Sequence, residues 1–193
     1  MNMSKKRQTL IVICECALMV ALATIFDLVL KFASWPNGGS ISACAIPIVF
    51  LSYRRGWKWG LAGGFVLSGI QMLLSFWAPP SKTFFAFLLV ILLDYLIAFT
   101  VLGAAELFAM PFKNKRVGYG IGAFAVSFLR FLCSFFSGIL IWPVPDGVDA
   151  PRYIYSLTYN GGYMIPNAIL TTVIIVALCI FLDPKTLRKP KKD

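Results

Sequence analysis

The chain has 193 residues, of which 59% are hydrophobic and 13% are charged, and its mean hydropathy is +0.80. Soluble domains carry roughly 45–50% apolar and about 25% charged residues, so this composition excludes an ordinary water-soluble domain. Histidine is absent, which removes the commonest metal ligand and the commonest acid–base group, and we expect neither a metal or cofactor site nor an enzyme.

Six long apolar segments follow one another, and each predicts a membrane-spanning helix. In chain order they cover residues 9–32, 41–53, 60–77, 84–108, 119–142 and 162–182. About 20 apolar residues cross the bilayer core as a helix, in which all backbone polar groups are paired. The segment at 41–53 is short and needs support from neighbouring helices or a thinned bilayer. We therefore expect an all-α membrane protein with six transmembrane helices, built as a single domain over residues 1–193.

Positively charged residues determine the predicted orientation. Of the 18 Lys and Arg residues, 14 lie in the N-terminal segment, in the loops after the second and fourth apolar segments, and in the C-terminal tail. By the positive-inside rule these stretches are cytoplasmic, so both termini lie inside and the number of spans is even. The net charge of +10 is thus a topology signal, with anionic lipid headgroups as a secondary contact. No nucleic-acid partner is expected.

Ionisable side chains inside the apolar segments are functional candidates because burying a charge in a membrane is costly. Asp27 and Lys31 are four residues apart and can pair on one helix face. Glu15 and Glu106 fall toward the predicted cytoplasmic ends of their helices, where an interfacial or packing role suits both.

Asp94 lies in the middle of the fourth segment, with no basic residue within a helical turn. At 1.5 Å per residue it is about 15 Å from the outer end of its helix. A carboxylate at that depth needs a partner, because desolvation disfavours its charged form. Two partners remain open at this point: Arg130, at a similar depth in the fifth segment, or a cationic ligand.

Aromatic residues concentrate near the predicted outer face, together with one amide. The group comprises Trp142, Tyr153, Tyr155, Tyr159, Asn160 and Tyr163. An interfacial aromatic belt explains several of these without any ligand. Aromatic faces beside an amide also suit a flat heteroaromatic ring, and a carboxylate beneath them suits a cation.

Ala17 and Ala21 place two small side chains on one face of the first segment. This spacing lets another helix approach closely. Packing within the chain and docking of a separate subunit both remain possible from this pattern alone.

Several blocks of sequence, taken in order, identify a family. They are PNGGSIS at 36–42, IPIVFLSYRRG at 46–56, LLDYLIAF at 92–99, Ser137-Gly138, YIYSLTYN at 153–160 and YMIP at 163–166. In this combination the chain resembles the thiamine-specific substrate-binding (S) components of energy-coupling factor (ECF) transporters, over nearly its whole length. The resemblance implies a multi-pass protein of the bacterial cell membrane that binds thiamine near the outer face and does no catalysis.

The resemblance also assigns roles to individual residues. Asp94 would meet the positive charge of thiamine, with Tyr95 beside it, and Gly138 would permit close approach to the ligand. The aromatic and amide groups of the pocket would be Trp142, Tyr155 and Asn160.

Ser134 departs from the family pattern, in which this position often holds a histidine. Serine keeps a hydrogen-bonding group but loses ring stacking and reach. An S component for a thiamine precursor or a related heteroaromatic cation is therefore an alternative.

The resemblance further implies that Ala17 and Ala21 dock the shared transmembrane coupling subunit, which two ATPase subunits drive. A stand-alone ion-coupled carrier is the competing hypothesis. It needs a polar path to the cytoplasm, for which Glu15, Glu106 and Gln71 are the candidates, and no inverted repeat is visible.

Overall fold

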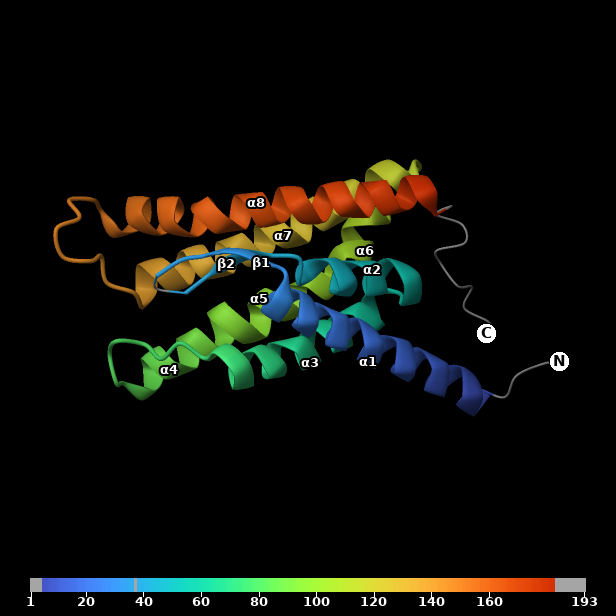
Figure 1. Cartoon of the computed structure of the whole chain (residues 1–193), viewed down its shortest axis with the longest axis horizontal. Coiled ribbons are helices and arrows are strands. Elements are labelled where there is room, and N and C mark those ends of the chain that lie inside the picture. The colour runs from blue at the N-terminus through green and yellow to red at the C-terminus, as the bar shows by residue number, and fades with distance from the viewer. Residues whose placement is uncertain (1–4, 37, 183–193) are drawn as a thin grey trace.

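The computed structural model describes residues 5–36 and 38–182, and this part of the chain is predominantly helical (Figure 1). The basic C-terminal tail predicted to be cytoplasmic lies outside the described residues. In chain order the elements are α1 (Lys5–Val29), β1 (Lys31–Ser34), β2 (Ser40–Ser42), α2 (Ala45–Arg55), α3 (Trp57–Ser75), α4 (Phe84–Val90), η1 (Ile91–Leu96), α5 (Ile97–Thr100), η2 (Val101–Ala104), α6 (Ala105–Ala109), α7 (Lys115–Leu140) and α8 (Arg152–Phe181).

Because α4 to α6 follow one another without a break, the described residues form six helical stretches, the number predicted. Four stretches are long and apolar enough to cross a membrane: Lys6–Val29, Phe84–Ala109, Lys115–Leu140 and Arg152–Phe181. The 11 residues of α2 are too few for an independent crossing. This agrees with the expectation that the short segment at 41–53 needs support from neighbouring helices or a thinned bilayer.

A short antiparallel hairpin corrects the all-helical prediction. Strands β1 and β2 pair with Ser34 opposite Ser40, in a region predicted to end the first span at 32 and to begin the second at 41. The tip turns through Gly38 and Gly39, whose φ angles of +92° and +90° favour glycine. Asn167 of α8 fixes β2, because its side chain accepts a hydrogen bond from the Ser42 backbone N–H (2.9 Å) and donates one to the Ser40 carbonyl (2.7 Å).

The last helix also begins earlier than predicted, at Arg152 rather than at 162. Pro151 precedes it with an extended backbone, and proline suits the start of a helix because it lacks an N–H that the first turn leaves unpaired. The aromatic segment that follows is therefore helical and presents its side chains with helical spacing. A 30-residue helix is about 45 Å long, which exceeds the roughly 30 Å hydrocarbon core.

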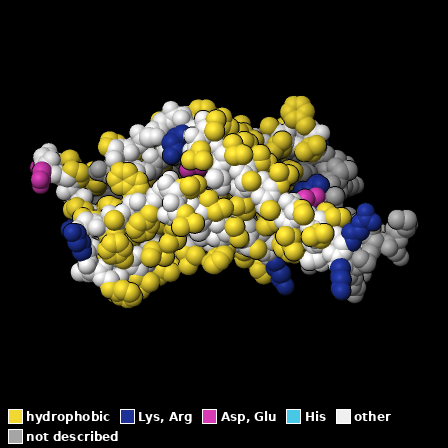
Figure 2. All heavy atoms as spheres, turned by 60° about the horizontal axis from the view of Figure 1, so that its bottom comes forward, with side chains coloured by type: hydrophobic (Ala, Val, Ile, Leu, Met, Phe, Trp, Pro, Cys, Tyr) yellow, Lys and Arg dark blue, Asp and Glu magenta, His cyan; other side chains and the backbone are white. Residues whose placement is uncertain are grey.

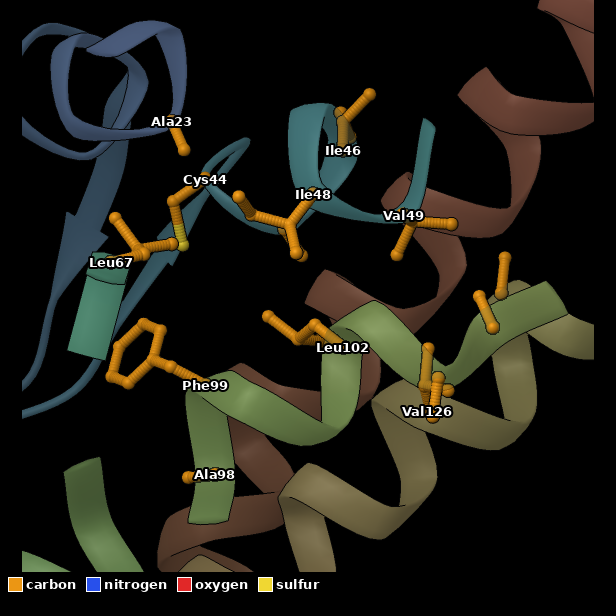
Figure 3. Close-up of a cluster of buried hydrophobic side chains, with 14 of the residues drawn as sticks. Ala23, Cys44, Ile46, Ile48, Val49, Leu67, Ala98, Phe99, Leu102 and Val126 are labelled. Carbon is orange, nitrogen blue, oxygen red and sulfur yellow. The ribbon is translucent and has the colours of Figure 1, made fainter. Parts of the chain in front are cut away.

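Helices α7 and α8 lie side by side, whereas α1 and α3 lie on the opposite side of the molecule (Figure 1). Buried side chains from α1, α2, α3, α5 and α7 meet between them, among them Ala23, Leu67, Phe99 and Val126 (Figure 3). Apolar side chains cover the middle of the face in Figure 2, and most charged side chains lie toward its two ends. This distribution suits a protein surrounded by lipid.

Glycine lets α3 and the fourth stretch cross at backbone distance. A Cβ on Gly103 would overlap the backbone of Gly60, and a Cβ on Gly60 would overlap the Gly103 carbonyl. Near this crossing, the Glu106 carboxylate accepts a hydrogen bond of 2.7 Å from the Trp57 backbone N–H at the start of α3. Glu106 is 4% exposed, so it has a packing role rather than contact with water.

Two ends of the molecule can be distinguished in Figure 1. At one end, named here the loop end, lie the connections 76–83 and 141–151; α1 begins and α8 finishes at the other, named the terminal end. Glu15 of α1 forms ion pairs with two residues at the end of α2, Arg54, at 3.3 Å, and Arg55.

Candidate functional site

Two adjoining cavities lie toward the loop end and contain every residue of the predicted ligand site. The larger, named the outer cavity, has a volume of about 410 Å³. The smaller, named the inner cavity, has a volume of about 150 Å³. Both are lined by the same four residues, which form their junction: Trp77, Asp94, Ser134 and Tyr163.

Asp94 lies in the π-helical turn η1, a backbone irregularity that often occurs at functional sites. Its Oδ2 atom accepts a hydrogen bond of 2.6 Å from the Ser137 hydroxyl and one of 3.4 Å from Nε1 of Trp142. Trp142 Nε1 also lies 3.3 Å from Ser137 Oγ. The carboxylate is therefore held between the fourth helical stretch and α7, at the junction of the two cavities.

The pairing of Asp94 with Arg130 is not formed in the described residues. The guanidinium of Arg130 instead lies over the Phe99 ring, 4.3 Å from its centroid, and donates a long hydrogen bond of 3.7 Å to Cys44 Sγ. Arg130 lines the inner cavity. Of the two partners that the sequence leaves open for Asp94, the Arg130 pair is therefore not observed in this part of the chain, and the cationic ligand stays a prediction.

Asn160 and Gly138 hold α7 against α8. The Asn160 side-chain amide donates to the Ser134 carbonyl at 3.2 Å and to the carbonyl and hydroxyl of Ser156, each at 3.1 Å. Its Oδ1 accepts from the Tyr163 hydroxyl at 2.8 Å. A Cβ on Gly138 would overlap the Ser156 side chain. Both residues line the outer cavity. However, the Asn160 amide is already hydrogen-bonded, and the space beside Gly138 is already filled by Ser156.

Three tyrosines follow successive turns of α8 and line or approach the cavities. The ring centroids of Tyr155 and Tyr159 are 5.6 Å apart, and those of Tyr159 and Tyr163 are 6.2 Å apart. Trp35 of the hairpin region packs on Tyr163 with a centroid distance of 5.6 Å. The Tyr159 hydroxyl donates to the Gly38 carbonyl at 2.9 Å, so this aromatic row also attaches the hairpin tip to α8.

Tyr95 lines the inner cavity and positions the connection after α3. Its hydroxyl donates to the Ser75 carbonyl at 2.7 Å and accepts from the Trp77 backbone N–H at 2.9 Å. Trp77 itself lines both cavities and was missed at the sequence level, because a tryptophan at the end of an apolar segment matches an interfacial belt.

Ser134 is 7% exposed and lies at the junction of the two cavities. Its small side chain leaves the junction open, where a histidine would fill part of that space. Three further walls of the inner cavity, Asp27, Gln71 and Ser75, were not predicted as site residues. Asp27 does form the predicted contact with Lys31, at 4.0 Å, although Lys31 begins β1 and not a turn of α1.

Ala17 and Ala21 are both exposed on α1. They do not pack inside the chain, which removes that explanation of their spacing. The polar residues that a carrier path requires lie in separate surroundings: Glu15 beside Arg54 and Arg55, Glu106 at the start of α3, and Gln71 in the inner cavity.

A family model described as "Thiamine transporter protein (Thia_YuaJ)" matches residues 13–187. The chain belongs to this family. It is 33% identical to the thiamine transporter ThiT of Bacillus subtilis (strain 168), over 99% of this chain and 100% of that protein. It is 28% identical to the thiamine transporter ThiT of Lacticaseibacillus paracasei, over 90% of this chain and 89% of that protein.

The fold is similar to a solved structure of ThiT from Listeria monocytogenes, with a TM-score of 0.74 and 19% sequence identity. That match covers 94% of this chain and 100% of the other. The family resemblance noted in the sequence is thereby confirmed. Membership of the thiamine transporter family and four long apolar helices identify a multi-pass protein of the bacterial cell membrane.

Proposed function

We propose that this chain binds thiamine at the loop end and serves as the substrate-binding subunit of an ECF-type ABC importer. The observation that carries the proposal is the position of Asp94, at the junction of two cavities and among aromatic rings. The names of the relatives add support, because both are called thiamine transporters.

The chemistry of the outer cavity suits a permanent organic cation. The thiazolium ring of thiamine cannot lose its charge by releasing a proton, so it needs a fixed anion or electron-rich faces. Asp94 supplies the anion, and aromatic faces attract cations through their quadrupole; Trp77, Trp142 and Tyr155 line the same cavity. A volume of about 410 Å³ falls within the roughly 300–1,000 Å³ typical of small-molecule pockets.

The proposed topology has six spans with both termini in the cytoplasm. Its support is that α1 begins and α8 finishes at the same end of the molecule (Figure 1). Arg54 and Arg55 are the last residues of α2, which ends on the side of the terminal end (Figure 1). The positive-inside rule then places the terminal end inside and the loop end, with its cavities, outside.

The proposed partners are a transmembrane coupling subunit and two ATPase subunits. The described residues share one buried core, and we assign ATP hydrolysis to the partners. Exposure of Ala17 and Ala21 on α1 supports α1 as the docking helix, since small residues let a partner helix approach closely.

The test is a titration of the purified, detergent-solubilised protein with thiamine, its phosphates and its aminopyrimidine fragment. Tryptophan fluorescence monitors binding during each titration. Trp77 and Trp142 line the outer cavity, so bound thiamine should quench their emission. Tight binding of thiamine alone supports the proposal. Preference for the fragment would favour a precursor transporter, as Ser134 allows, and the absence of quenching or calorimetric heat with micromolar ligand would refute binding of this vitamin class.

A further inference from the structure

The inner cavity contains a buried amide group with no hydrogen-bond partner. Gln71 is 4% exposed and lies on the face of α3 that also buries Leu67 and Ser68. Its Nε2 atom makes no hydrogen bond within the described residues, and neither does Nε of Arg130, another wall of this cavity. Buried polar groups in folded proteins are nearly always paired. The N–H groups of Gln71 Nε2 and Arg130 Nε can therefore donate hydrogen bonds to a molecule in the cavity.

The nearby carboxylates are engaged with other groups. Asp27 accepts a hydrogen bond of 3.0 Å from the Ser42 hydroxyl and lies 4.0 Å from Lys31. Asp94 accepts from Ser137 and Trp142. The amide of Gln71 is therefore left to a molecule inside the cavity.

The size of the inner cavity matches one six-membered ring. Its volume is about 150 Å³, and an engineered protein cavity of about 150 Å³ takes up benzene. Its walls include the polar side chains of Gln71, Ser75 and Arg130, which suit a ring with nitrogen atoms better than a hydrocarbon. The junction at Asp94 joins it to the outer cavity, so two linked rings can occupy both at once.

We propose that Gln71 is a specificity-determining residue that binds the aminopyrimidine ring of thiamine in the inner cavity. This inference rests on the proposed function. A glutamine amide forms two hydrogen bonds with the amino group and N7 of adenine, and the aminopyrimidine of thiamine likewise presents an amino group beside a ring nitrogen. The thiazolium ring then occupies the outer aromatic cavity, with Asp94 near the link between the rings.

The experiment compares two ligands on the full-length protein in detergent: thiamine, and its N-benzyl analogue, in which a benzene ring replaces the aminopyrimidine. In Gln71→Leu, the Kd for thiamine should rise about 10- to 100-fold, since a bidentate pair contributes about 1–3 kcal/mol of discrimination. The Kd for the N-benzyl analogue should stay within about threefold of wild type, because benzene has no edge for Gln71 to bind. Gln71→Met provides a second variant of similar size if the leucine variant folds poorly.

The matched control is Thr171→Val on α8. Thr171 is fully buried, and its hydroxyl also lacks a hydrogen-bond partner among the described residues, but it lines neither cavity. It should leave both affinities unchanged. The ligand-free unfolding temperature of Gln71→Leu should equal or exceed that of wild type, because the variant removes an unpaired buried amide.

Three results would overturn parts of this reasoning in distinguishable ways. An unchanged Kd for thiamine in Gln71→Leu would mean that the amide faces only water. An equal loss of affinity for both ligands would make Gln71 a structural residue without a role in ring recognition. If folded wild-type protein binds no thiamine, the proposed function fails, and the role of Gln71 fails with it.

Discussion

Replacing Asp94 by asparagine tests charge recognition directly. The variant keeps the size of the side chain, and its amide oxygen can still accept from Ser137 and Trp142, as the carboxylate does. Two unit charges about 4 Å apart attract by about 4 kcal/mol at an effective dielectric constant of about 20. Because water in the open cavity screens part of this attraction, we expect a loss of about 2–4 kcal/mol, which raises the Kd for thiamine about 30- to 1,000-fold.

Isothermal titration calorimetry at fixed salt measures this effect in three arms. Thiamine and the N-benzyl analogue both carry the thiazolium charge and should both lose affinity, whereas the uncharged aminopyrimidine fragment should lose much less. The exposed carboxylate of Asp146, at the same end of the molecule, provides the control variant Asp146→Asn, which should bind as wild type.

The folded state should respond to Asp94→Asn in the opposite direction. Asp94 forms no ion pair among the described residues, so the neutral amide lowers the cost of burial. We expect the ligand-free unfolding temperature to stay constant or to rise. A folded variant with a Kd within about threefold of wild type would refute the assignment of Asp94 as the partner of the cation.

Three further substitutions test docking, helix contact and the hairpin. Ala17→Trp should lower thiamine uptake at least about tenfold in cells that contain the coupling subunits, without changing the Kd in detergent. The control Ile169→Trp, at an exposed position on α8, should change neither uptake nor Kd. Normal uptake with Ala17→Trp would show that α1 is not part of the docking surface. Gly138→Ala should destabilise the protein by about 1–3 kcal/mol because the added methyl overlaps α8, and an unchanged thermal midpoint would contradict that contact. Asn167→Leu removes two hydrogen bonds to β2, at a cost of about 1–3 kcal/mol for each buried group left unpaired, and should speed thiamine release in stopped-flow fluorescence; an unchanged release rate would separate the hairpin from ligand retention.

The sequence predicts the helices well where the bilayer sets their length. The fourth span is expected at 84–108 and observed at Phe84–Ala109, because a long apolar run bounded by polar residues has few other ways to satisfy its backbone in lipid. The hairpin depends on a different kind of information. Asn167 fixes β2 from a position 125 residues away in sequence from Ser42, and local patterns do not reveal such a contact.

Some residues of the candidate site can also be recognised from the sequence, whereas others need the three-dimensional structure. Asp94 is visible from sequence because an acidic residue in an apolar run is conspicuous. Gln71 is less conspicuous: it is uncharged, and only its position beside the inner cavity gives it a specific role. Asn160 is recognised as a polar group near the ligand, but its hydrogen bonds to Ser134 and Ser156 follow from a helix that begins ten residues before the predicted start.

The π-helical turn explains why two adjacent residues, Asp94 and Tyr95, both reach the cavities. Ala86 and Val90 are buried four residues apart, as in a regular helix, but the next buried residue is Tyr95, five positions on. Ala98 and Phe99 then follow Tyr95 after three and four residues, which is again the helical spacing. The interval is five residues instead of four because a π turn inserts one extra residue. Without it, the inward-facing stripe would continue from Val90 to 94, and Tyr95 would turn about 100° away from the connection that it fixes through Ser75 and Trp77. Nearly every residue around the turn is apolar, so hydropathy alone does not reveal this shift. The orientation of Asp94 and Tyr95 toward the cavities depends on the backbone conformation of the turn.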